Sequence, residues 1–271
     1  MKRYVLFLKL ISTALNNSLV IIPTFNEKEN IADIIDVVLT LSHPFDILVV
    51  DDGSPDGTAE IVKSRMEQKP DRIFLSERNG KLGLGTAYIE GFKWGLDKGY
   101  DYLFEMDADF SHNPEDLINL YHACAHEGND LAIGSRYVTG VNVVNWPMSR
   151  VLMSYFASKY VRVVTQMPIN DTTAGFKCYK REVLETINLD KIRFVGYAFQ
   201  IEMKFKTWKH GFSIKEVPII FTDRTKGESK MSKGIFKEAV LGVIKLKINS
   251  WFKKYPQKKT PDLTNTEQKV A

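Results

Sequence analysis

The chain has 271 residues, of which 44% are hydrophobic and 26% are charged, and its formal net charge is +4. This composition is typical of a globular protein that buries a core of its own, and it excludes a disordered or low-complexity chain. The two cysteines, Cys124 and Cys178, lie far apart. They support neither a disulfide framework nor a zinc site built on C-x-x-C pairs, and they favour a reducing compartment.

The first residues imitate a signal peptide, because a short basic start is followed by an apolar run. Lys9 interrupts that run, and no small-x-small cleavage site follows it. We therefore expect a leader helix over residues 1–17 and a protein that stays in the cytoplasm. No stretch reaches the roughly 20 consecutive apolar residues that a membrane-spanning helix requires.

From residue 18 onward, short apolar runs alternate with amphipathic stretches, which is the pattern of an α/β protein with a mostly parallel sheet. The first two runs, 19–22 and 46–50, predict buried strands. Each ends in a polar loop that carries acidic residues, 23–27 and 51–58. Because parallel strands end at the same edge of a sheet, these loops should line one pocket.

The run that starts at Tyr102 ends abruptly on two carboxylates one residue apart, Asp107 and Asp109. A proline-containing helix start, 113–116, follows, so the pair is expected in the strand-to-helix crevice where open α/β sheets bind ligands. Paired carboxylates suit Mg²⁺ or Mn²⁺, which take one or two carboxylates together with substrate phosphates. A turn with solvated aspartates is the alternative for an isolated D-x-D, and the two earlier acidic loops argue against it.

Two other patterns invite different kinds of site. The glycines of 80–87 follow a weaker strand at 72–75, but their order does not match G-x-G-x-x-G, which argues against a nicotinamide or flavin enzyme. His122 and His126 lie at i and i+4 on a predicted helix without the Glu of H-E-x-x-H or a third ligand, so a half-exposed helix face is the better interpretation. Neither a stacking module nor a recognition helix for nucleic acid is present.

The second half of the chain adds basic residues at the ends of strands. Arg136 follows a strand predicted at 129–134, and a compact loop at 171–177 precedes another strand. The last strand, 214–221, contains Pro218, which favours the edge of the sheet. The predicted helices are 28–41, 58–66, a helix that ends near 98, 146–166, 181–187 and 198–209.

Seven segments, in this order, resemble the motifs of family 2 glycosyltransferases, and within that family those of the dolichol- or polyprenol-phosphate mannosyltransferases. The segments are 23–27, 51–58, 81–88, 106–109, 134–137, 196–202 and 224–230. The resemblance implies the GT-A fold, with a mostly parallel central sheet flanked by helices and a catalytic domain over 18–230. It also implies one displacement with inversion, from GDP-mannose to a polyprenyl (dolichyl) monophosphate, with Mg²⁺ or Mn²⁺ as cofactor.

The resemblance assigns roles residue by residue. The nucleoside would be held by Pro23, Phe25, Glu27, Val50 and Asp52. Asp107, Ala108 and Asp109 would meet the metal and the diphosphate, with Asp107 and Asp109 as the metal ligands. Asp109, Arg136, Arg224 and Lys230 would form the catalytic group, the last three by binding phosphates. Phe25 stands where the family commonly has Tyr, and Ser111 replaces a Gln that serves some relatives as a further metal ligand.

The chemistry leaves alternatives open. A lipid phosphate is already anionic near pH 7, so no protein base is required, and catalysis should come from positioning and electrostatic stabilisation. UDP-glucose or another sugar nucleotide could replace GDP-mannose as donor with the same acceptor. A non-catalytic protein that keeps the nucleotide fold and docks to membranes is the alternative from a different class.

The C-terminal region concentrates positive charge. Between residues 230 and 259 the chain carries nine lysines and one acid, Glu238, interleaved with apolar residues. This pattern predicts a basic amphipathic helix over 231–255 that lies at the cytoplasmic face of a membrane, with a membrane subunit as a possible partner. A core-packed helix with a solvated basic face is the alternative. We expect a disordered tail over 256–271.

Overall fold

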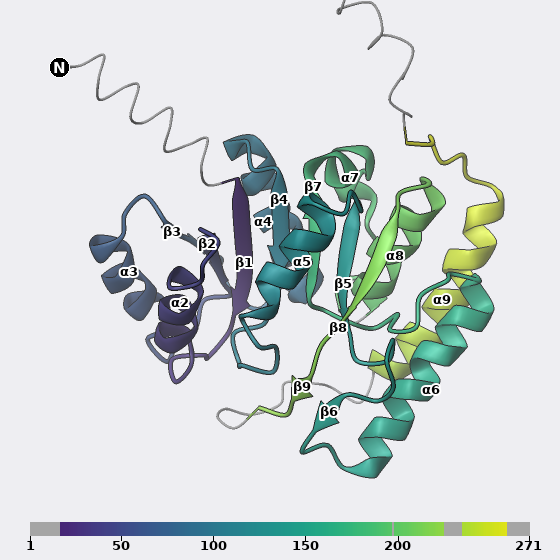
Figure 1. Cartoon of the computed structure of the whole chain (residues 1–271), viewed down its shortest axis with the longest axis horizontal. Helices are drawn as coiled ribbons and strands as arrows, with labels where there is room; N and C mark the ends of the chain where they lie inside the picture. Colours follow the sequence, from purple (N-terminus) through teal and green to yellow (C-terminus); the bar gives the residue numbers. More distant parts are fainter. Residues whose placement is uncertain (1–16, 197, 225–234, 259–271) are drawn as a thin grey trace, which may run out of the picture.

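The computed structural model describes residues 17–196, 198–224 and 235–258 (Figure 1). The expected leader helix over 1–17, except its last residue, lies outside the described residues, as do Lys230 and the tail from 259 onward. Residues 256–258, the start of the expected disordered tail, are held in place. Lys258 pairs with buried Asp130 at 2.6 Å, and the carbonyl of Pro256 lies 2.7 Å from His210 Nδ1.

Within the described residues, a central sheet has seven strands in the order β3-β2-β1-β4-β7-β5-β8. All but one of these strands run in the same direction, and β7 is antiparallel to both of its neighbours. The sheet is therefore mostly parallel, as predicted. The strands are β1 (Ser18–Thr24), β2 (Asp46–Asp51), β3 (Ile73–Glu77), β4 (Tyr102–Glu105), β5 (Leu131–Ser135), β7 (Lys177–Lys180) and β8 (Ile214–Pro218).

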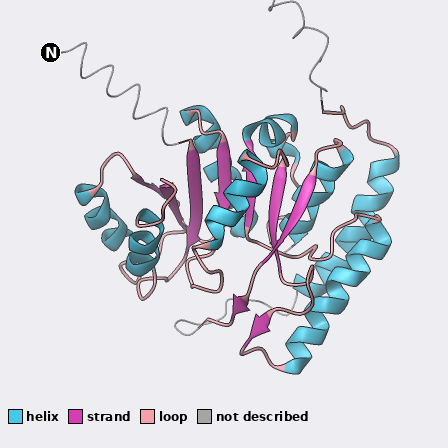
Figure 2. Ribbon diagram, in the orientation of Figure 1, coloured by secondary structure: helices cyan, strands magenta, loops and turns pink. Residues whose placement is uncertain are grey.

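Helices cover both faces of this sheet (Figure 2). In β1, Leu19 and Ile21 pack in the core on the face covered by α4 and α8, whereas Val20 and Ile22 pack with α2 and α5. Strands buried on both faces need continuous apolar runs, which explains the pattern in the sequence. The helices are α2 (Ile31–Leu39), α3 (Thr58–Gln68), α4 (Leu84–Lys98), α5 (Asp116–Ala125), α6 (Met148–Thr165), α7 (Arg181–Thr186), α8 (Ala198–Lys209) and α9 (Ile235–Trp251).

The last predicted strand is divided in the structure. β8 ends at Pro218, at the edge of the sheet as expected, and the chain leaves the sheet after Ile219, whose N–H donates to the carbonyl of Ser135 at 3.1 Å. Phe221–Thr222 forms a separate strand, β9, which pairs with β6 (Val143–Val144) below the main sheet in Figure 1. This small sheet brings the residues after β9 under the ends of β4 and β5.

Helix α9 packs beside α6 at the outer edge of the molecule (Figure 1). The hydroxyl of Tyr160 donates to the carbonyl of Val240 at 2.9 Å, and Lys247 reaches the carbonyl of Thr165 at 3.2 Å. Val243 of α9 is buried in the core. The C-terminal helix is thus packed along part of its length and is not a detached arm.

Candidate active site

A cavity of about 450 Å³ opens where β1, β2, β4 and β5 end. Most of the residues that the sequence singled out line this cavity, although they come from segments far apart in the chain. These residues are Pro23, Phe25, Glu27, Asp52, Asp107, Ala108, Asp109, Arg136 and Arg224. Val50 is different, because its side chain is fully buried in the core of β2. Only its backbone could contact a nucleoside.

The two carboxylates lie directly after β4, on the wall of the cavity. Burial and the charge of Asp109 raise the pKa of Asp107 to about 7. Burial would also raise the pKa of Asp109, but hydrogen bonds from Ser111 and the charge of Arg224 hold it below its ordinary value. A bound cation would stabilise the ionised form of both groups.

Arg224 already places a positive charge at this position. Its Nη2 lies 2.8 Å from Oδ2 of Asp109, and Ser111 N donates to Oδ1 of the same carboxylate at 3.1 Å. The arginine follows β9, so the small sheet below the main one positions it. The ion pair joins the residue expected to hold a metal to a residue expected to hold a phosphate.

The donor set fits a divalent cation that is held partly by its substrate. No group of three or more His, Cys, Asp or Glu side chains suited to a metal occurs in the described parts of the chain. Asp107 and Asp109 could therefore supply only part of a coordination shell. Mg²⁺ and Mn²⁺ accept this arrangement, because phosphate oxygens and waters complete their shells.

The other end of the cavity is shaped by the loops after β1 and β2. Asp52 is buried and accepts a hydrogen bond from Nε of Arg78 at 2.6 Å. Burial raises the pKa of Asp52, and the Arg78 interaction offsets part of that rise. Lys81 lies over the ring of Phe25, with 5.2 Å between Nζ and the ring centroid. An aromatic ring, a cation and a carboxylate together can hold a nucleoside by stacking and hydrogen bonding.

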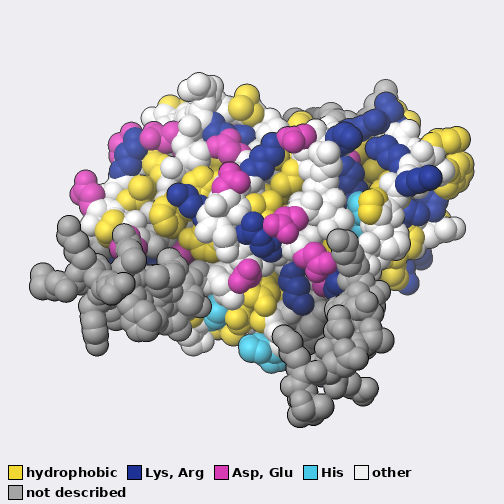
Figure 3. Space-filling model, turned by 90° about the horizontal axis from the view of Figure 1, so that it is seen from above, with side chains coloured by type: hydrophobic (Ala, Val, Ile, Leu, Met, Phe, Trp, Pro, Cys, Tyr) yellow, Lys and Arg dark blue, Asp and Glu magenta, His cyan; other side chains and the backbone are white. Residues whose placement is uncertain are grey.

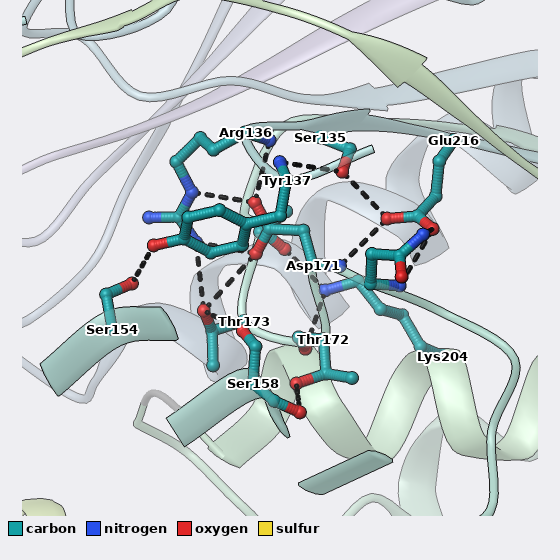
Figure 4. A network of polar contacts seen from close by, with 12 residues as sticks. Ser135, Arg136, Tyr137, Ser154, Ser158, Asp171, Thr172, Thr173, Lys204 and Glu216 are labelled. Carbon is teal, nitrogen blue, oxygen red and sulfur yellow. Dashed lines mark hydrogen bonds and ion pairs between the residues drawn. The ribbon is translucent and has the colours of Figure 1, made fainter. Parts of the chain in front are cut away.

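Arg136 lines the cavity, and its guanidinium group is hydrogen-bonded to the loop that carries Asp171 (Figure 4). Its Nε and Nη2 donate to the two oxygens of Asp171, at 2.7 and 2.6 Å, and Nη2 also reaches Thr173 at 2.9 Å. Asp171 is fully buried, and although burial alone would raise its pKa, Arg136 lowers it. The guanidinium that was expected to meet phosphate is thus also the partner that makes Asp171 stable in the interior.

The loop that carries Asp171 is held on its other sides as well (Figure 4). Glu216 accepts the backbone N–H groups of Asn170 and Asp171, both at 2.8 Å. Lys204 is fully buried and donates to the carbonyls of Thr172 and Ala174. Side chains of β8 and α8, together with Arg136 from the loop after β5, therefore fix a loop whose residues Thr173, Ala174 and Gly175 line the cavity.

Several residues of the site were missed by the sequence interpretation. Arg150, in the first turn of α6, lines the cavity and donates to Asp223 at 2.7 Å. Gln200 also lines the cavity, as does His112, whose buried Nδ1 has no hydrogen-bond partner among the described residues. Arg78 does not line it but holds Asp52, which does. Gln200 lies in segment 196–202, one of the seven segments that resemble family motifs. That resemblance was the only sequence feature that pointed to Gln200. Nothing local in the sequence marked Arg78, and Arg150 was noted only as part of the basic edge of its helix.

The family to which the chain belongs follows from a direct comparison. The model of the family described as "Glycosyl transferase family 2" matches residues 19–187. The chain belongs to glycosyl transferase family 2. A "Polyprenol monophosphomannose synthase" of Mycolicibacterium smegmatis is 49% identical over 226 residues, which is 83% of this chain and 85% of that protein. An "Undecaprenyl-phosphate mannosyltransferase" of Micrococcus luteus is 47% identical over 225 residues, 83% of this chain and 91% of that protein.

Solved structures of two distant proteins share the fold. A glucosyl-3-phosphoglycerate synthase from Mycobacterium tuberculosis, in complex with Mn²⁺, UDP and its product, aligns with a TM-score of 0.61 at 17% identity, over 89% of this chain and 81% of that one. The mannosyltransferase PcManGT from Pyrobaculum calidifontis, in complex with GDP-Man and Mn²⁺, aligns at 0.54 and 18%, over 90% and 66%. This glycosyltransferase therefore has the expected GT-A fold.

None of the helices in the described parts of this glycosyltransferase has the length and hydropathy that crossing a bilayer requires.

Proposed function

We propose that this glycosyltransferase transfers mannose from GDP-mannose to a polyprenyl (dolichyl) monophosphate, with inversion, giving a polyprenyl β-mannosyl phosphate and GDP. The observation that carries the proposal is the single cavity in which Asp107, Asp109, Arg136 and Arg224 meet. The names of the two relatives that are nearly half identical over most of this chain support the mannosyl group and the lipid phosphate.

The arrangement of charges fits the transfer of a sugar between phosphates. Asp107 and Asp109 would hold Mg²⁺ or Mn²⁺, which when bound neutralises negative charge on the departing diphosphate. Arg224 and Arg150 line the same cavity, and guanidinium groups bind phosphate oxygens in a fork. These residues can orient two anionic substrates toward one another, which is the main task where no proton has to be moved.

The acceptor supplies its own nucleophile. A lipid monophosphate is anionic near pH 7, so an oxygen of the phosphate can attack the anomeric carbon while the bond to the diphosphate breaks, and GDP departs with the bonding electrons. The cavity needs no general base for this step. The role of its side chains is positioning and stabilisation of the charge that develops on the leaving group.

A lipid acceptor requires contact with a bilayer, and one edge of the molecule suits it. Exposed apolar side chains of α6 and α9 include Phe156, Leu241 and Trp251, and Phe252 follows them. Lysines accompany them, and Figure 3 shows basic and hydrophobic side chains together at the edge of the molecule where α9 ends. We propose that this edge rests on the cytoplasmic face of an anionic membrane.

The donor and the acceptor can be tested together. The full chain is incubated with labelled GDP-mannose, UDP-glucose or other sugar nucleotides, Mg²⁺ or Mn²⁺, and a short-chain polyprenyl phosphate. We expect organic-phase label from GDP-mannose alone, and only when metal is present. Label from UDP-glucose would replace the proposed donor, and no label from any donor would favour a docking protein without catalysis.

Two variants distinguish the loss of an acidic side chain in the site from the loss of one elsewhere in the fold. Asp109→Asn should lower the rate by about a hundredfold or more, because it removes a charge that positions the metal and the diphosphate. Asp101→Asn changes an exposed acid just before β4 and should leave the rate unchanged. An active, metal-independent Asp109→Asn enzyme would contradict the proposal.

A further inference from the structure

A fully buried ion pair lies beneath the cavity. Glu105, the last residue of β4, and Lys177, the first residue of β7, are register partners in the antiparallel pair of strands. Lys177 Nζ lies 2.9 Å from Oε1 of Glu105, and neither side chain is exposed. Burying two charges costs free energy that their mutual attraction repays only in part, so the pair is weak evidence for a purely stabilising role.

The ion pair fixes the side-chain amide of Gln200. Nε2 of Gln200 donates to Oε2 of Glu105 at 2.7 Å, and Oε1 accepts a hydrogen bond from Lys177 Nζ. An ammonium group can only donate and a carboxylate can only accept, so the amide has one possible orientation. Its nitrogen must face Glu105, and its oxygen must face Lys177.

The side chain of Gln200 reaches the wall of the cavity. Gln200 is among the lining residues, and so is Gly175. A Cβ placed on Gly175 would stand 3.6 Å from Nε2 of Gln200 and would meet nothing else within 4 Å. Only 2% of Gln200 is exposed, and the absence of a side chain at position 175 leaves the space beside its amide nitrogen unfilled. That nitrogen carries two hydrogens, and Glu105 takes one of them.

The position of the amide relates it to the donor. Glu105 lies two residues before Asp107, at the end of the same strand, so the Gln200 amide adjoins the carboxylates expected to meet the diphosphate. In a nucleotide sugar, the hexose is bonded directly to that diphosphate. We therefore expect the hexose, the part of the donor next to the diphosphate, to lie beside the amide.

We propose that Gln200 binds the sugar of the donor. Its second amide N–H donates to a hydroxyl of the donor's hexose, and the Glu105–Lys177 pair holds the amide in the orientation that does so. Gln200 touches the substrate, whereas Glu105 and Lys177 are positioning residues. The inference rests on the proposed function, because it assumes that a nucleotide sugar occupies the cavity.

Two variants test the contact in different ways. Gln200→Met removes the amide at nearly constant volume, and Gly175→Ala leaves the buried network intact but covers the nitrogen with a methyl group. If Gln200→Met fails to fold, Gly175→Ala still tests the contact, because its added methyl group meets no other atom within 4 Å. Gln68→Met, at the exposed end of α3, is the matched control.

The readout compares ligands with and without the sugar. Binding of GDP and of GDP-mannose to the full chain is measured by calorimetry in the presence of Mn²⁺. Both variants should bind GDP within about twofold of the wild type, and GDP-mannose about tenfold or more weakly, as for the loss of one hydrogen bond in a desolvated site.

The outcomes separate this inference from the proposed function. Unchanged binding of GDP-mannose in both variants would overturn the role of Gln200, as would an equal loss of affinity for GDP and GDP-mannose. If the wild-type chain bound neither ligand, the proposed function itself would be overturned.

Discussion

At the residue scale, the ion pair of Arg224 bears directly on how the site could bind a metal ion. Its guanidinium is paired with Asp109, the carboxylate expected to hold a divalent cation. An arginine and a metal ion cannot both stand within bonding distance of the same carboxylate oxygen without strong repulsion. We expect a metal ion at Asp109 to weaken or open this ion pair, because the two cations repel one another, and Arg224 could then contact phosphate.

This competition can be measured without turnover. Arg224→Gln should bind Mn²⁺ about tenfold more tightly than the wild type in the absence of nucleotide, because the metal no longer displaces a cation. Titration of Mn²⁺ followed by electron paramagnetic resonance gives the affinity directly.

The control for this prediction is Arg150→Gln. It removes a positive charge from the same cavity, but from a residue paired with Asp223. Arg150→Gln should raise the affinity for Mn²⁺ much less than Arg224→Gln does. Equal gains in the two variants would mean that only the total charge of the cavity matters, and the direct competition would be refuted.

At the scale of elements, the loop between α6 and β7 is the part of the site that depends most on buried charge. Asp171 within it is fully buried and is held by Arg136, a residue in the loop after β5. Breaking such a pair leaves the other charge buried and unpaired, which is among the most costly changes a protein can undergo. The shape of the cavity wall thus depends on this ion pair together with the hydrogen bonds of Glu216 and Lys204.

Asp171→Asn should lower the free energy of unfolding by about 3–5 kcal/mol at pH 7. The pKa of Asp171 in the folded state lies below its ordinary value of 3.8. The stabilisation is therefore present above pH 3.8 and is lost as the pH falls through the lower, folded-state pKa. Denaturant unfolding of wild type and variant should accordingly give a difference that narrows below pH 3.8.

An exposed pair provides the comparison for Asp171. Asp36 on α2 pairs with Arg65 at the surface, with 53% of the Asp36 side chain exposed. Asp36→Asn should cost about 1 kcal/mol or less, because water and salt screen exposed pairs. A loss for Asp171→Asn no larger than that of Asp36→Asn would show that the buried pair does not hold the loop.

At the scale of the whole molecule, the proposed function requires the cavity and the edge formed by α6 and α9 to act together. Arg150, which lines the cavity, and Met148, which is exposed, both lie in the first turn of α6. The N-terminal end of this helix therefore belongs both to the cavity wall and to the apolar edge. Farther along this edge, Trp251 is 69% exposed and Phe252 84%. An enzyme that draws a lipid phosphate from a bilayer needs its cavity beside the surface that meets the lipid.

Phe252→Ser should weaken binding to vesicles that contain anionic lipid by about tenfold, because burial of a Phe side chain contributes about 1.5–3 kcal/mol. Cosedimentation with such vesicles measures the change, and binding should also weaken as salt is raised. Val37→Ser, an exposed apolar residue on α2, is the control and should have no effect. Vesicle binding that is unchanged by Phe252→Ser would remove this edge as the docking surface.

Much of the fold and the centre of the site could be predicted from the sequence, because the signals for them are local. The apolar runs that became β1, β2 and β4 and the polar loops at their ends lie next to each other in the chain. Periodicity and turn chemistry act over a few residues, so they mark strands and helices, and the abrupt end of the apolar run that starts at Tyr102 drew attention to the pair Asp107 and Asp109. The boundaries were less accurate: α2 begins at Ile31 because residues 28–30 form a turn closed by the carbonyl of Glu27.

Only the tertiary structure decided which distant side chains meet. Arg136 and Asp171 are separated by 35 positions, and Gln200 and Glu105 by 95. Such pairs depend on the order of the strands and on the packing of helices on both faces, which no local pattern encodes. The sequence by itself therefore determined the strands, the acidic loops and the family, whereas the partners of Arg136, the burial of Val50 and the orientation of the Gln200 amide followed from packing.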